Sequence, residues 1–136
     1  MPPEQAEIRQ WLVKARRDWA LAEKAKHPPV PAPDLAGFHC EQAAEKTLKA
    51  YLMANGVPFE KIHDLRQLLK LCATADSAFL ELREAVEPLT VYAVAFRYPG
   101  PADPTPERVE AALQAVTRIW NFVTQRLSPN VLPVDE

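Results

Sequence analysis

Residues 38–57 read FHCEQAAEKTLKAYLMANGV, residues 63–69 read HDLRQLL, and residues 92–100 read YAVAFRYPG. The first stretch belongs to one amphipathic helix, which we expect over residues 35–55, with Asn-Gly as its C-terminal stop. In the second stretch Asp64 is a natural N-cap and Gln67 holds the matching capping-box position, which predicts a helix start. The third stretch ends a helix in an Arg-Tyr-Pro turn, because proline cannot continue a helix.

Helical periodicity extends outward from these stretches in both directions. It predicts a first helix over residues 4–26, a fourth helical region over residues 76–97 that Pro88 kinks or splits, and a last helix capped by Thr105. No alternating strand pattern is present, so we expect an all-α fold: an antiparallel, up-and-down bundle of four main helices plus one short helix. The side chains expected in its core include Trp11, Trp19, Leu48, Leu52, Phe96, Leu113 and Trp120.

Length and composition indicate one ordinary globular domain. We expect it over residues 1–136, with a core from about 5 to 127 and a frayed tail over 128–136. The formal net charge of −2 gives no sign of a bulk electrostatic attraction to nucleic acid. There is no signal-peptide pattern and no apolar run near the ~20 residues that span a bilayer, so we expect a cytoplasmic protein without membrane contact. Cys40 and Cys72 lack metal-ligand spacing and are read as small apolar residues, and we expect no metal and no cofactor.

The three quoted stretches, in this order and separation, resemble the HEPN domain family over roughly residues 11–127. The resemblance implies a small helical bundle that homodimerises. It also implies a minimal nucleotidyltransferase protein as partner, in a toxin–antitoxin-like or related two-component system. Several branches of the family are metal-independent ribonucleases, in which an arginine, four to six intervening residues and a histidine form the active site.

The resemblance places Arg97 at the arginine position of that ribonuclease motif. The histidine would fall at residues 102–104, which are Ala102, Asp103 and Pro104, and no histidine follows His63. Cleavage without metal needs a group that takes the 2′-hydroxyl proton and one that protonates the leaving oxygen, and histidine does both near neutral pH. We therefore expect an interaction module. A divergent ribonuclease that uses Arg97 with His63 or Asp103, and a nucleotide-binding module, remain as alternatives.

Residues that could bind RNA or a nucleotide flank the predicted turns. Arg97 could bind phosphate and Tyr98 could stack on a base, although a helix C-terminus and bundle packing are structural alternatives for them. His63 beside the N-cap could face a phosphate, or it could only pack at the helix start. His39 and Lys46 share a helix face that could line a ligand groove or a dimer interface, and a solvated face is the alternative.

Two further expectations concern the helix over residues 35–55. Glu41 falls near its apolar stripe and should have a partner, because burial of an unpaired carboxylate is costly. Besides the stripe with Leu48 and Leu52, the helix carries a second apolar face. A small domain covers one face internally, so this second face, formed by Ala43, Ala50 and Met53, supports the expected homodimer.

Overall fold

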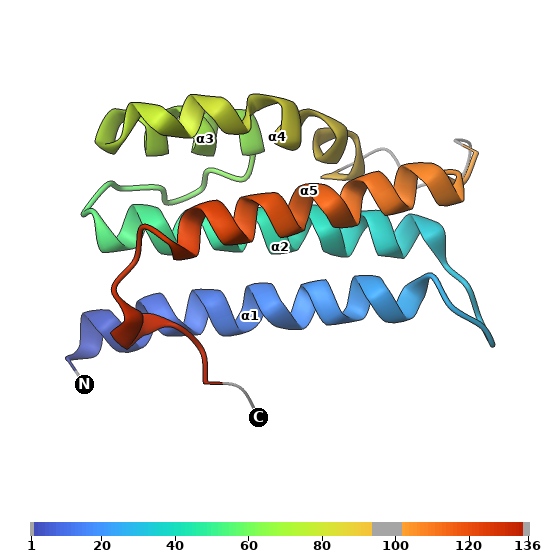
Figure 1. Cartoon of the computed structure of the whole chain (residues 1–136), viewed down its shortest axis with the longest axis horizontal. Helices are drawn as coiled ribbons and strands as arrows, with labels where there is room; N and C mark the ends of the chain where they lie inside the picture. The colour runs from blue at the N-terminus through green and yellow to red at the C-terminus, as the bar shows by residue number, and fades with distance from the viewer. Residues whose placement is uncertain (1, 94–101, 135–136) are drawn as a thin grey trace.

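The computed structural model describes residues 2–93 and 102–134. Its elements are α1 (Pro3–Ala25), α2 (Pro33–Ala54), α3 (Leu65–Ala75), η1 (Ser77–Leu82), α4 (Arg83–Thr90), η2 (Val91–Ala93), α5 (Pro106–Thr124) and η3 (Pro129–Val131), where η marks 3₁₀ helix. In Figure 1, α2 and α5 form the middle of the bundle, α1 packs along one side of α2, and α3 and α4 lie on the other side. There is no strand among the described residues, and the predicted all-α bundle is confirmed.

The predicted helix boundaries are set by local hydrogen bonds. The Asp64 carboxylate accepts hydrogen bonds from the backbone N–H groups of Arg66 at 2.8 Å and Gln67 at 3.4 Å, and so caps α3. The Thr105 hydroxyl caps α5 in the same way, 3.2 Å from the Arg108 amide. After α2 ends, Gly56 takes φ = 67°, a left-handed conformation that costs glycine little.

We expect Asp64→Ala to lower the free energy of unfolding by about 1 kcal/mol, because two amides of the first turn of α3 lose their acceptor. Urea unfolding followed by circular dichroism measures the change. Asp34→Ala is the matched control, since Asp34 lies in the first turn of α2, which has no side-chain cap. An equal loss in both variants would mean that charge near a helix start, and not the cap, is responsible.

The segment from residue 76 to residue 93 departs from a single kinked helix. It is divided into η1, α4 and η2, and the changes of helix type fall at residues 82–83 and 90–91, while Pro88 lies inside α4. Asp76 accepts a hydrogen bond from the Ala78 amide at 2.9 Å and from Arg126 Nε at 3.1 Å, which fixes the start of η1 against the turn that follows α5. Pro88 is the sixth of the eight residues of α4, and its missing N–H removes one backbone hydrogen bond without ending the helix.

The core is centred on α2. Leu48, Leu52 and Leu113 are buried as predicted, and Phe79 packs between Tyr51 and Phe122 with ring centroids 4.3 and 4.9 Å apart. The three tryptophans are only partly buried and lie at the margin of the core, where Trp19 meets Trp120 and Trp11 meets Phe59. Phe96 lies outside the described residues.

The chain after α5 differs from the predicted frayed tail. Ser128 caps η3, Val131 is buried, and Arg9 Nη2 of α1 donates a hydrogen bond to the carbonyl oxygen of Asn130. One apolar side chain and one backbone acceptor therefore hold residues 129–131 on α1.

The second apolar face of α2 is covered within the chain. Ala43 and Ala50 are buried, and His39 and Lys46 on the same face bond to Asp18 of α1. The sequence argument for a dimer from an uncovered face of α2 is therefore wrong, because α1 runs along that face (Figure 1). The dimer itself stays a prediction.

Candidate functional site

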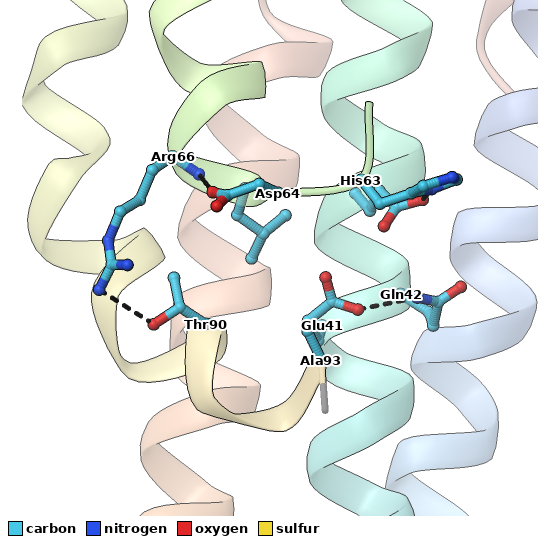
Figure 2. A pocket seen from close by; sticks show the side chains of 9 residues that line it. Glu41, Gln42, His63, Asp64, Arg66, Thr90 and Ala93 are labelled. Carbon is cyan, nitrogen blue, oxygen red and sulfur yellow. Dashed lines mark hydrogen bonds and ion pairs between the residues drawn. The ribbon is translucent and has the colours of Figure 1, made fainter. Parts of the chain in front are cut away.

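A pocket of about 640 Å³ opens between α2, the start of α3 and the end of α4, which is within the range of about 300–1,000 Å³ typical of small-ligand pockets. Its lining comes from four segments: Glu41, Gln42 and Glu45 of α2, His63 to Arg66 around the start of α3, Thr90 of α4, and Ala93 of η2. Figure 2 shows Arg66 on one side of the pocket and His63 on the other, with Glu41 of α2 between them and Gln42 below His63.

His63 is held at the pocket by a buried carboxylate. Its Nδ1 lies 3.2 Å from Oε2 of Glu45, whose side chain is 7 % exposed, whereas the imidazole is 73 % exposed. The linker after α2 brings His63 back over the middle of that helix, and the Asp64 cap fixes the turn that follows. A carboxylate that orients an imidazole while leaving its other nitrogen in solvent is an arrangement suited to proton transfer.

The buried side chain of Lys49 also bonds to the Glu45 carboxylate. Its Nζ lies 3.0 Å from Glu45 Oε2 and 3.5 Å from His63 Nδ1, and its side chain is 6 % exposed. The ammonium also lies 5.5 and 5.7 Å from the ring centroids of Trp11 and Phe59, within cation–π range. Glu45 and Lys49 are one helical turn apart on α2, a spacing common for ion pairs on exposed helix surfaces, but here both side chains are buried.

Arg66 is fully engaged on the other side of the pocket. Its Nε and Nη2 donate to the two carboxylate oxygens of Glu87 at 2.6 and 2.7 Å, a two-point contact that matches the planar guanidinium. This pair lowers the pKa of Glu87 and raises that of Arg66. Thr90 Oγ1 lies 3.5 Å from Nη2, as the dashed line in Figure 2 shows.

Glu41 is buried, as its position near the apolar stripe indicated. It is 1 % exposed, and its Oε1 accepts a hydrogen bond from Gln42 Nε2 at 2.8 Å. The neighbouring amide of Gln42 is one of the partners that this carboxylate has.

The charges of the described lining do not suit a phosphate. Glu41, Glu45 and Asp64 bring three carboxylates to the pocket, and one of them, Glu45, is paired with Lys49. The guanidinium of Arg66 is likewise paired with Glu87. Lys49 is buried behind Glu45 and does not line the pocket. Carboxylates repel a phosphate group, so the described residues favour proton transfer or contact with a neutral or cationic group over nucleotide binding.

The other candidate residues are not brought to this pocket. His39 Nδ1 lies 2.9 Å from Asp18 Oδ1, and Lys46 Nζ bonds to Asp18 Oδ2, so both face α1 and are partly buried instead of solvated. Asp103 is exposed in the segment before α5 and does not line the pocket. Arg97 and Tyr98 lie outside the described residues.

Sequence reasoning missed Asp18, which is buried between α1 and α2. A signal for it existed, because Asp18 falls on the buried stripe of α1 between Ala15 and Ala22. A carboxylate on an apolar stripe needs a cationic partner, and His39 and Lys46 lie two helical turns apart on the facing helix.

Both cysteines are free and buried, and burial raises the pKa of each thiol to about 12. Among the described residues, no group of three or more histidine, cysteine, aspartate or glutamate side chains is arranged to hold a metal ion. Within the same residues, no helix combines the length and the apolar character that crossing a membrane requires.

Comparisons with known proteins agree on the family. The model of the HEPN domain matches residues 8–127. The crystal structure of an archaeal HEPN homologue superposes with a TM-score of 0.72 at 22 % identity, covering 89 % of this chain and 98 % of that chain. No curated protein matches in sequence. With the family model spanning most of its length, this helical chain belongs to the HEPN domain family.

Proposed function

We propose that this chain is a dimeric interaction module that acts with a minimal nucleotidyltransferase protein in a toxin–antitoxin-like or related two-component system. The observation that carries the proposal is the absence of a histidine after Arg97, where the ribonucleases of the family have one; residues 102–104 are Ala, Asp and Pro. Two free, buried cysteines suit the reducing cytoplasm, where we place the complex.

The contacts of the described residues support a non-catalytic role. His39 is bound to Asp18, Arg66 to Glu87, and Lys49 to Glu45, so these groups stabilise the bundle. Asp103 is exposed and away from the pocket, and an exposed carboxyl group is a poor general acid at neutral pH. The three carboxylates of the pocket also count against the nucleotide-binding alternative.

Co-expression tests the partnership. The chain and the minimal nucleotidyltransferase encoded by a neighbouring gene should co-purify through a tag on either protein, and the isolated chain should be a dimer by light scattering. A monomer at micromolar concentration would contradict the dimer. Failure to co-purify in both tag orientations would contradict the partnership.

The Glu45–His63 contact favours the ribonuclease as the second candidate. In it, His63 would exchange protons with RNA while Glu45 fixes the imidazole, and Arg97 would bind phosphate. Neither a second histidine nor an unpaired cation lines the described pocket to complete the reaction.

We expect no rapid cleavage when the purified dimer is incubated with structured and unstructured RNA in chelator. General acid–base catalysis contributes about a hundred- to ten-thousand-fold in rate, and its loss leaves only slow, binding-assisted cleavage. A gel time course measures this. Rapid cleavage that is lost in both Arg97→Ala and His63→Ala, and kept in Asp103→Asn and in the surface control His27→Ala, would establish the second candidate instead.

A further inference from the structure

A separate groove lies between α3 and α4, on the side of the bundle away from α1 (Figure 1). Leu69 of α3 and Val86 of α4 are buried and form its floor, and Leu80 of η1, which is 40 % exposed, forms one wall. The groove has a volume of about 180 Å³. That is below the ~300 Å³ at which small-ligand pockets begin, and it suits one large apolar side chain.

The rim of the groove is positively charged. Lys70 and Arg83 line it, and neither has a carboxylate within ion-pair distance in residues 2–93 and 102–134. Arg83 Nε donates to the carbonyl oxygen of Leu80, a contact that positions the guanidinium without neutralising it. Glu87, the one carboxylate among the described lining residues, is held by Arg66 in the two-point contact above.

The apolar floor and the two unpaired cations at the rim together favour an occupant that has an apolar side chain with acidic residues beside it. An apolar side chain would cover the exposed part of Leu80 and fill the space above Leu69 and Val86, which are already buried. Removal of apolar surface from water is the main source of affinity at protein interfaces. Acidic residues next to it would meet Lys70 and Arg83, which adds specificity and speeds association. A basic segment would meet repulsion at the same place.

We propose that the groove between α3 and α4 docks an acidic segment of a partner protein, with one large apolar side chain of that segment seated on Leu69, Leu80 and Val86. The inference rests on the proposed interaction role and names the surface and the partner chemistry for it. The inference does not depend on the pocket beside His63, although Arg66 lines both that pocket and the groove.

The test uses the whole purified chain and a fluorescein-labelled, alanine-based helical peptide. The peptide carries one leucine with glutamates one turn before and after it on the same face. Fluorescence anisotropy measures affinity, and ¹H–¹⁵N spectra locate the site. We expect saturable binding with shifts on α3, η1 and α4, and about tenfold weaker binding to Lys70→Glu/Arg83→Glu, because two attractive rim contacts become repulsive.

Two controls separate docking from general charge effects. Lys14→Glu/Arg17→Glu makes the same change of charge on exposed residues of α1 and should bind as wild type does. Peptides with lysine in place of glutamate, or with alanine in place of the leucine, leave the protein unaltered and should each bind about tenfold less. Absence of binding, equal binding of the lysine peptide, or shifts outside α3 to α4 would overturn the proposal. So would conversion of a wild-type dimer to a monomer by Lys70→Glu/Arg83→Glu, because the occupant would then be a second copy.

Discussion

Glu45→Ala is expected to lower the free energy of unfolding by about 3–5 kcal/mol, the usual effect of removing one partner of a buried ion pair. The variant leaves the buried Lys49 ammonium without a carboxylate, beside the rings of Trp11, Phe59 and His63. It also removes the acceptor that holds His63 over α2. Chemical denaturation at neutral pH measures the loss.

Two further variants test whether the lost stability of Glu45→Ala comes from leaving the Lys49 charge buried and unpaired. Glu45→Leu/Lys49→Met replaces the pair with apolar groups of similar size and should be close to wild type, because no buried charge remains. His63→Ala should change stability by less than about 1 kcal/mol, since the imidazole is 73 % exposed. If His63→Ala were as damaging as Glu45→Ala, the linker contact would be the main stabilising interaction instead of the ion pair.

Gly37→Ala is expected to destabilise the protein by about 1–3 kcal/mol, the range for overpacking a core. Alanine is the better helix former by roughly 1 kcal/mol, so the isolated helix α2 would favour the substitution. In the folded chain a Cβ at Gly37 would lie 2.3 Å from Cδ1 and from Cε1 of the buried Tyr92 ring. Tyr92 belongs to η2, which ends at Ala93 on the rim of the pocket.

The sign of this effect should invert once the ring is removed. In a Tyr92→Ala background the added methyl meets no ring, and Gly37→Ala should then stabilise by up to about 1 kcal/mol through helix propensity. Thermal and urea unfolding of wild type, Gly37→Ala, Tyr92→Ala and the double variant gives the free energies of this double-mutant cycle. Destabilisation in both backgrounds would show that some neighbour other than Tyr92 limits the space at residue 37.

The bundle could be predicted from sequence because its helix signals are local. Asp64 and Thr105 cap helices through their own first turns, and Gly56 supplies the left-handed residue after α2. The division of residues 76–93 into three short helices is not set by local sequence alone. Asp76 is held by Arg126, which lies in the turn after α5 and 50 residues away in sequence. The docking of Val131 likewise depends on α1.

The candidate site was less predictable, because periodicity shows which residues share a face but not which helix covers it. His39 and Lys46 were correctly grouped, yet their face meets Asp18 of α1 instead of solvent or a ligand. His63 was singled out as a neighbour of the α3 start. Its contact with Glu45 spans a linker whose path no residue pattern specifies.

The docking of η3 on α1 brings the two ends of the described chain to one end of the bundle (Figure 1). A short polar linker could join them, with new termini opened in the exposed turn at residues 28–31. For the same reason, tags fused at either end emerge beside α1, across the bundle from the groove of α3 and α4, and leave that face free for a partner.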